Sequence, residues 1–389
     1  MVACAPLTTE APDDRDVFDA PIDGLSAPEL ASFVRGDAEF GRRFSPSAGL
    51  GPVFNNVSCL SCHSGDGRGQ LQNSLQRIGS PADDFLRALG GPQIQDKAIA
   101  GSIAEFVPSG VAVSLRLPPP VFGVGLIEAI PEASILALAD PDDLNGDGIS
   151  GRPNMVTSAP YTSSVEPGGG SGPKLGRFGR KAQVSNLLEQ VVEAYHQDMG
   201  ITSEFRPHEN GNPQSGLPPD AGDMVADPEL GSATVRSVVQ YIRTLAPPPP
   251  GTETASRSQG RLHFNAIGCA SCHVATLQTG AGSTTIAALS NRRVDLYSDL
   301  LLHDMGDALA DNRPDGSATG REWRTTPLWG LRLIRHFLNG DALLLHDGRA
   351  RSVEAAILLH GGEAQRARDA FAALPAVSKQ ALLDFVESR

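Results

Sequence analysis

The sequence is poor in aromatic residues and in long apolar runs, and each shortage narrows what the chain can be. Only 5% of the 389 residues are aromatic, whereas glycine and proline together supply 42 + 30 = 72 residues. No apolar stretch reaches the roughly 18 residues that a membrane-spanning helix needs, so we expect no transmembrane segment. Abundant glycine and proline with few aromatics predict small helical units joined by long loops.

Basic residues are also few for a chain of this length. The 32 lysines and arginines against 45 acidic residues give a net charge of −13. A surface this acidic argues against nucleic acid and anionic membranes as partners. It suits a basic partner protein, although the same net charge also serves simple solubility.

The cysteines number only five, but four of them repeat one pattern. Cys59-Leu60-Ser61-Cys62-His63 and Cys269-Ala270-Ser271-Cys272-His273 are both C-x-x-C-H, the attachment signature of a c-type haem. The two thiols add to the vinyl groups of the porphyrin, and the histidine ligates the iron. A zinc site or a pair of redox dithiols are the alternatives, but neither explains a histidine after each pair. The sequence therefore predicts two covalently bound haem c groups.

Covalent haem and the fifth cysteine both suggest a cellular location. Covalent haem is attached on the outer side of the bacterial inner membrane, so we expect a periplasmic protein. Val2-Ala3-Cys4 is similar to the end of a lipoprotein cleavage site, with Cys4 as the lipid anchor and the signal removed. A stray cysteine in a disordered tail is the alternative, and no secretion signal is visible.

Helical patterns surround both motifs and set the predicted domains. Ser26-Ala27-Pro28-Glu29 is a capping box followed by apolar residues at helical spacing, and further apolar stripes cover 184–199, 235–245 and 378–387. We predict a mainly α protein with two cytochrome c-like haem domains and long loops, the first domain enlarged by insertions. The predicted parts are an N-terminal arm over 1–25, a first domain over 26–246, a Pro-rich linker over 247–256 and a second domain over 257–389.

A short acidic segment is a candidate calcium loop. Asp143, Asn145 and Asp147 lie in a D-x-N-x-D-G pattern, the first half of an EF-hand-type loop. The twelfth position is Asn154 where such a loop has a bidentate glutamate. A surface turn is the alternative reading of the same residues.

The second axial position of each iron decides between binding a small molecule and relaying electrons. His360 follows Val353 at helical spacing on an apolar face, in the same predicted domain as the second haem, and is our candidate ligand for it. Met305 is the next candidate. Met199 lies on an apolar stripe, where core packing is the better reading, and His196 is a weaker candidate.

The chain resembles the di-haem oxidoreductase family of the bacterial di-haem cytochrome c peroxidase and MauG superfamily. Gly51-Pro52-Val53-Phe54-Asn55-Asn56 and Asp198-Met199-Gly200-Ile201-Thr202-Ser203 carry the resemblance. So do residues 59–69, 123–131, 147–154, 176–179, 300–306, 325–330 and 345–363, so that it covers nearly the whole chain.

The resemblance implies roles for particular residues. In the peroxidases a His-Asp-Gly loop precedes the helix with the axial methionine, and here His346-Asp347-Gly348 places His360 at that position. The superfamily meets peroxide at the N-terminal haem with a distal glutamate, which makes Glu128 the expected acid beside His63. No tryptophan precedes Trp323, so that residue or Trp329 would replace the usual bridge between the haems.

The predicted function is that of a haem-dependent oxidoreductase of the peroxidase type. Hydrogen peroxide would react at the first haem, and electrons would pass through the second. Expected partners are a small redox donor protein or a protein substrate, with a second copy of the chain as a further candidate. MauG-like oxidation of a protein partner and a di-haem electron-transfer cytochrome without peroxide chemistry are the alternatives.

Overall fold

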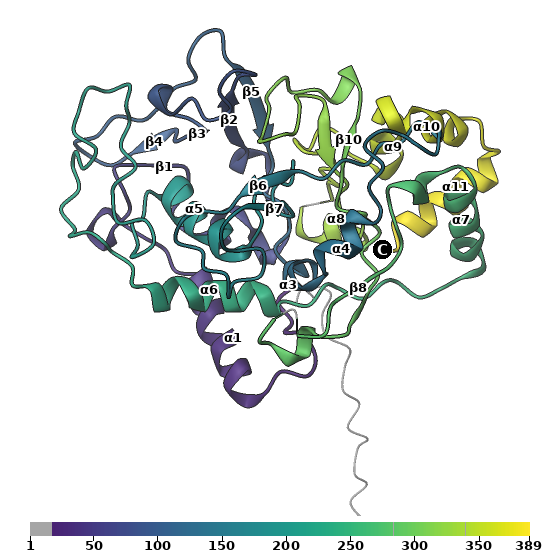
Figure 1. Ribbon diagram of the computed structural model, residues 1–389, viewed down its shortest axis with the longest axis horizontal. Coiled ribbons are helices and arrows are strands. Elements are labelled where there is room, and N and C mark those ends of the chain that lie inside the picture. The colour runs from purple at the N-terminus through teal and green to yellow at the C-terminus, as the bar shows by residue number, and fades with distance from the viewer. Residues whose placement is uncertain (1–17, 283, 339) are drawn as a thin grey trace, which may run out of the picture.

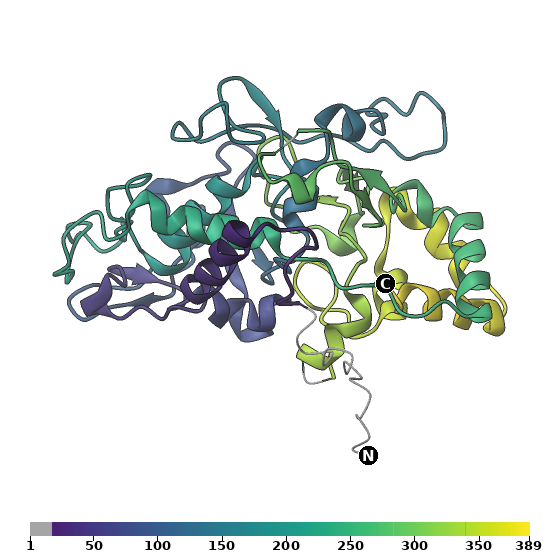
Figure 2. The same ribbon diagram turned by 90° about the horizontal axis from the view of Figure 1, so that it is seen from below.

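The computed structural model describes residues 18–282, 284–338 and 340–389. Cys4 and most of the predicted arm lie outside the described residues. Two groups of helices lie on either side of the molecule, with short strands and long connections between and around them (Figure 1, Figure 2). Among the described helices, none is long and apolar enough to cross a membrane.

The first helical group surrounds the first C-x-x-C-H motif. Its helices are α1 (Ala27–Phe40), α5 (Leu187–Met199) and α6 (Ser232–Thr244). The predicted capping box starts α1, because the Ser26 N–H donates to Glu29 Oε2 at 2.7 Å. The side chain of Asn186 caps α5. α6 packs against both other helices through a buried apolar face.

The second helical group carries the second motif and repeats one feature of the first. Its helices are α7 (Ala255–Ala266), α9 (Val353–Leu359), α10 (Gln365–Ala372) and α11 (Ala376–Val386). α7 packs against α11 as α1 packs against α6. Both crossings occur at a glycine: a Cβ on Gly36 would lie 2.2 Å from the Ser237 carbonyl oxygen, and one on Gly260 1.9 Å from that of Ala381. A side chain at either glycine would therefore push the helices apart.

Short antiparallel sheets and single helical turns occupy the connections. β2 (Leu75–Gly79) pairs with β3 (Gln93–Ile94) and β5 (Ala112–Arg116). The two-stranded pairs are β1 (Val53–Phe54) with β4 (Lys97–Ala98), β6 (Met155–Thr157) with β7 (Pro173–Leu175), β8 (Leu277–Gln278) with β9 (Arg293–Val294), and β10 (Leu302–Asp304) with β11 (Glu322–Arg324). The short helices are α2 (Cys59–Cys62), α3 (Val124–Ala129), α4 (Glu132–Leu136) and α8 (Ile334–Phe337).

The hydrophobic cores cross the predicted linker. Leu289, Leu296 and Leu301 lie beyond it in the sequence but belong to the main core with α1, α5 and α6. Leu117 lies before it and belongs to the second core with Phe264. Each hydrophobic core therefore contains residues from both sides of the linker, and this packing joins the two helical groups. The predicted domain limits and the cytochrome c-like character of each domain stay predictions.

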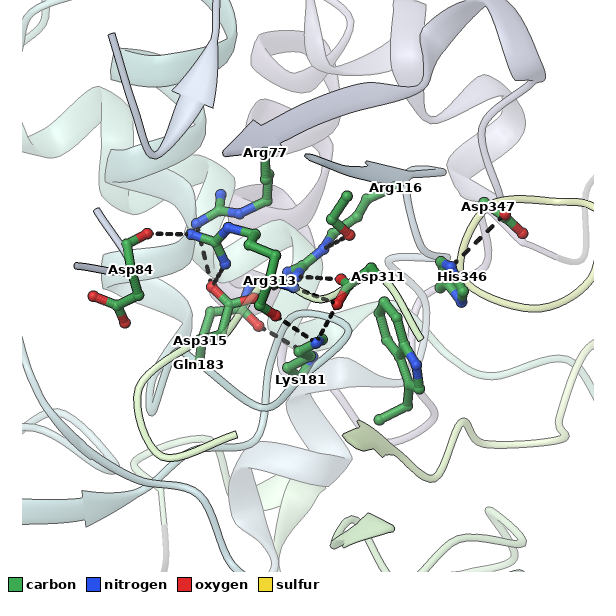
Figure 3. Close-up of polar contacts among 12 residues, drawn as sticks. Arg77, Asp84, Arg116, Lys181, Gln183, Asp311, Arg313, Asp315, His346 and Asp347 are labelled. Atoms are coloured by element: carbon green, nitrogen blue, oxygen red, sulfur yellow. Dashed lines mark hydrogen bonds and ion pairs between the residues drawn. The ribbon is translucent and has the colours of Figure 1, made fainter. Parts of the chain in front are cut away.

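A buried cluster of charged side chains also joins residues from before and after the linker (Figure 3). Lys181 is fully buried and lies 2.8 Å from Asp311. Arg116 of β5 and Arg313 both pair with Asp315. Burial alone would raise the pKa of Asp315, but the surrounding arginines hold it well below its usual range. Breaking one such buried pair costs about 3–5 kcal/mol, so the cluster fixes how these segments sit together.

Candidate functional site

The first C-x-x-C-H motif lies on a single helical turn. α2 begins after Ser58, whose side-chain oxygen accepts a backbone N–H at 3.1 Å. Residues three apart share one face of a helix, so Cys59 and Cys62 lie on the same side. His63 follows as the helix ends, and its N–H donates to the Cys59 carbonyl at 2.9 Å. One turn therefore presents two sulfurs and an imidazole together.

The two cysteines and His63 all line one cavity of about 210 Å³. Its walls come from α2, the Pro118-Pro119-Pro120 segment, α3, one face of α5, and residues 324–334 beyond the linker. Removal from water lowers the pKa of His63 to about 4. The imidazole is therefore neutral at pH 7, as a metal-ligating histidine must be.

Glu128, the predicted acid, supports this cavity from behind its wall. The side chain is buried on α3, where Val124 and Ile127 line the cavity and Glu128 does not. Its Oε2 accepts from Arg243 Nε at 2.6 Å, and its Oε1 accepts from the Leu187 N–H at 2.8 Å. Both oxygens are committed to an ion pair and to the first turn of α5. This position argues against proton transfer by Glu128 in the cavity, a role that stays a prediction.

A different acidic residue lines the cavity. Asp198 of α5 is the one carboxylate among the described residues of the wall. Its Oδ1 accepts from Gln93 Nε2 at 2.5 Å. Burial raises the pKa of Asp198 to about 6, against the opposing effects of this hydrogen bond and of Arg77. A carboxyl group with this pKa can both take up and release a proton near neutral pH.

The second motif holds its histidine in a defined tautomer. Cys269 lies on a short 3-10 turn, η5 (Cys269–Ser271), and Cys272 and His273 follow it. The His273 Nδ1–H donates to the Tyr297 carbonyl at 2.9 Å, which leaves Nε2 for a metal. Burial, together with the neighbouring His360, lowers the pKa of His273 to about 4.

His360 lies where the helical spacing indicates. α9 begins after Ser352, as predicted, and His360 is the residue directly after its last turn. The His360 Nδ1–H donates to the Ala356 carbonyl at 2.7 Å, and burial lowers the pKa of the imidazole. His360 is near enough to His273 to lower its pKa, and each imidazole uses Nδ1 in a backbone hydrogen bond, which leaves Nε2 for a metal. Ligation by His360 itself stays a prediction.

The other ligand candidates occupy different places. Met199 lines the first cavity and is buried in the main core. His196 is buried outside the wall, with Nε2 3.0 Å from the His208 carbonyl oxygen. The backbone of Met305 lies beside Gly361, next to His360.

The candidate calcium residues form an exposed turn in which side-chain oxygens accept hydrogen bonds from backbone N–H groups of the same turn. Asp143 accepts the Gly148 N–H at 3.1 Å, Asn145 accepts the Asp147 N–H at 2.8 Å, and Asp147 accepts the N–H of Ile149 at 2.9 Å. Such local bonds stabilise a turn without an ion. Calcium at these residues stays a prediction.

Comparison with known proteins identifies the family of this chain. A family model described as "Di-haem oxidoreductase, putative peroxidase" matches residues 6–79 and 95–389. The chain belongs to the di-haem oxidoreductase family. Its members are oxidoreductases with haem cofactors, which agrees with the predicted enzyme class.

No curated protein matches this di-haem oxidoreductase. Two solved structures are similar over nearly its whole length. Hydrazine synthase from Kuenenia stuttgartiensis shares 12% identity at a TM-score of 0.41, covering 100% of this chain and 96% of that one. The diheme peroxidase BthA from Burkholderia thailandensis shares 14% identity at 0.41, covering 97% and 88%. Likeness at this level carries no functional argument.

Buried arginines show that the first cavity fits the cofactor of a di-haem oxidoreductase. Arg68, Arg177 and Arg180 line the cavity, yet they are only 4%, 4% and 6% exposed. Among the described residues, Nε of Arg68, Nε of Arg177 and one terminal nitrogen of Arg324 have no hydrogen-bond partner. Other nitrogens of Arg68 and Arg177 donate to backbone carbonyls, but a buried donor without a partner is costly, so the wall suits an anionic group. Haem brings two propionates.

Sequence reasoning missed the polar residues on the α5 wall. Leu187, Val191, Ala194 and Asp198 follow one another at steps of three or four residues, so they share one face of the helix. Gln190 lines the same cavity, and its amide oxygen is buried without a partner among the described residues. The available signal was an acid on an otherwise apolar face.

Proposed function

We propose that this di-haem oxidoreductase is a peroxidase that reduces hydrogen peroxide to water with electrons from a small redox protein. One observation carries the proposal: the two motifs have different surroundings. The first opens on a cavity whose wall includes Asp198. The second has His360 as the neighbour of its histidine. A metal with room beside it can admit a small molecule, whereas one with two protein ligands relays electrons.

The proposal includes covalent haem at both motifs. When bound, the haem iron supplies the redox chemistry by which the O–O bond of peroxide is broken. The chain would supply two thioether-forming cysteines and one axial histidine at each motif, and His360 as the second axial ligand of the C-terminal haem. Arg68, Arg177 and Arg324, with their unpartnered nitrogens, would bind propionates.

Asp198 is assigned the proton transfer. The overall reaction is H₂O₂ + 2 H⁺ + 2 e⁻ → 2 H₂O, so a proton must move from one peroxide oxygen to the other before water leaves. A carboxylate with a pKa of about 6 can accept that proton and return it. Gln190 would accept a hydrogen bond from peroxide through its free amide oxygen. The apolar side chains of Val191 and Ala194 line the same wall and exclude bulk water.

Electron transfer between the two sites is assigned to Trp329. Trp329 lines the first cavity, while the nearby Leu331 packs against the second core. Trp323 has other contacts: it stacks on His346 at 3.8 Å, and the Lys181 ammonium lies 4.4 Å from its ring centroid. A cation over the ring is attracted to its electrons, which makes removing one harder. Trp323 is therefore the poorer relay.

The expected setting follows from the cofactor and the charge. Covalent haem implies the periplasm. The net charge of −13 favours a donor protein with a basic docking face, which would steer the encounter.

A ferric absorption spectrum of the holoprotein tests the proposal. We expect one high-spin haem whose Soret band shifts when peroxide is added, and one low-spin haem that does not respond. Steady-state assays should show peroxide consumed with oxidation of a reduced cytochrome donor. Two low-spin haems that stay inert to peroxide, also after partial reduction, would make the protein an electron carrier. Met199, which lines the first cavity, is then the ligand to replace, as Met199→Ala.

A further inference from the structure

A buried histidine beside the second motif lies between two carboxylates. His303 of β10 is only 2% exposed. Its Nε2 lies 2.8 Å from Asp299 Oδ2, and its Nδ1 lies 2.7 Å from Glu363 Oε2. Burial would lower the pKa of His303, but its hydrogen bonds to these two carboxylates raise it well above its usual range. Both ring nitrogens therefore carry protons and donate.

The residues around His303 contact both ligand-bearing segments of the second site. The Tyr297 carbonyl accepts from His273, and the Asp299 N–H donates to the Cys272 carbonyl at 2.9 Å. His303 Nδ1 is 3.5 Å from Cys272 Sγ. The imidazolium thus lies against the cysteine that the motif offers to the cofactor.

Glu363 ties the other side of His303 to the helix that presents His360. It lies three residues after His360, and its Oε1 accepts from the Ser150 hydroxyl at 2.6 Å and from the Asp304 N–H at 3.3 Å. With these bonds the carboxylate has little freedom to turn away from His303. A fixed cation and two fixed anions therefore lie beside the second site, with a net charge of −1.

We propose that Asp299, His303 and Glu363 form a charge clamp that sets the reduction potential of the second haem and holds the segment of His360 in place. His303 is a positioning residue in this scheme. Charges in a water-poor interior act with little screening, so one more or one fewer should change the ferrous-to-ferric equilibrium. The inference rests on the proposed haem ligation by His273 and His360, and it does not require peroxide chemistry.

Two substitutions of similar size change the charge in opposite directions. His303→Gln removes the cation, takes the clamp from −1 to −2, and should lower the midpoint potential of the second haem. Glu363→Gln removes an anion, takes the clamp to 0, and should raise it. We expect about a tenfold change in the ferrous-to-ferric ratio each way, or about 59 mV for a one-electron couple. Asp299→Asn should also raise the potential, and it serves if Glu363→Gln does not fold.

The measurement is a spectroelectrochemical titration of the holoprotein, with the low-spin electron paramagnetic resonance signal as a check on ligation. Shifts of opposite sign with a retained low-spin signal support the clamp. Shifts of the same sign, no shift, or a lost low-spin signal in both charge variants overturn it, because a merely structural role ignores the sign of the charge. If His360→Ala leaves the second haem low-spin, the proposed ligation has failed instead. A protein inert to peroxide leaves the potentials measurable, so that failure is separate as well.

Discussion

The two motif regions share one side and differ on the other. In each, a helix crosses its partner at a glycine, Gly36 or Gly260. Four residues later a phenylalanine ring lies 6.2 Å (Phe40) or 6.3 Å (Phe264) from the ring of the motif histidine. The side where the cofactor would attach is therefore built twice in the same way.

The opposite sides have little in common. The first motif opens on a cavity with arginines, an amide and a carboxylate in its wall. The second has His360 as neighbour and the charge clamp behind it. The comparison teaches that holding a cofactor and assigning it a task are separate problems. The shared side would hold the cofactor, and the residues on the opposite side would determine what the cofactor does.

The largest effect is expected from removing the acid at the first site. Asp198→Asn should slow peroxide reduction by about 10²–10⁴-fold with haem content unchanged, because the amide cannot accept the proton. Steady-state kinetics and a haem-stain assay check both parts. Glu128→Gln is the matched control and should keep its rate within a few-fold, since that carboxylate faces Arg243. Equal losses in both variants would remove the distinction between the two carboxylates.

The second haem should lose one of its two protein ligands when His360 is removed. His360→Ala should turn the second haem from low-spin to high-spin, because its second nitrogen ligand is gone. The visible spectrum and electron paramagnetic resonance report the change. Met305→Ala is the control and should leave the low-spin signal intact. The reverse result would make Met305 the ligand.

Glu128 should matter for stability instead of rate. Its side chain is 3% exposed and that of Arg243 13%, so Glu128→Gln leaves the buried Arg243 with Glu166 as its remaining carboxylate partner and should cost about 1.5–3 kcal/mol of unfolding free energy. Glu253→Gln breaks a pair whose side chains are 48% and 53% exposed, and it should cost less than about 1 kcal/mol. Chemical denaturation measures both, and similar losses would contradict the assignment of Glu128 to the wall.

The smallest effect is a pH dependence that only the first site should show. The deprotonated form of Asp198 accepts the proton, and burial raises its pKa to about 6. The rate with peroxide should therefore rise as the pH increases through 6, by about tenfold between pH 5 and pH 7. Asp198→Asn should give a flat profile over that range. A wild-type rate that falls with rising pH would mean that the protonated form is the active one.

Local features of the site were predictable from sequence, and the long-range ones were not. The capping box at Ser26, the start of α9 after Ser352 and the position of His360 all follow from spacing within one segment. The position of Glu128 behind the wall was not predictable because its partner, Arg243, lies 115 residues away in the sequence. Nothing near Glu128 distinguishes a carboxylate that faces a cavity from one that faces an arginine. Only the packing of α3 against α6 decides this.

The wall that residues 324–334 contribute to the first cavity has a consequence for biosynthesis. If the chain is exported to the periplasm as proposed, its N-terminus emerges first, so Cys59 and Cys62 appear long before that wall. A cofactor attached to them early would remain exposed to solvent until the last part of the chain arrived and folded over it. Maturation of the first site would thus wait for the end of translocation, and a truncated chain should carry its haem in an unfinished pocket.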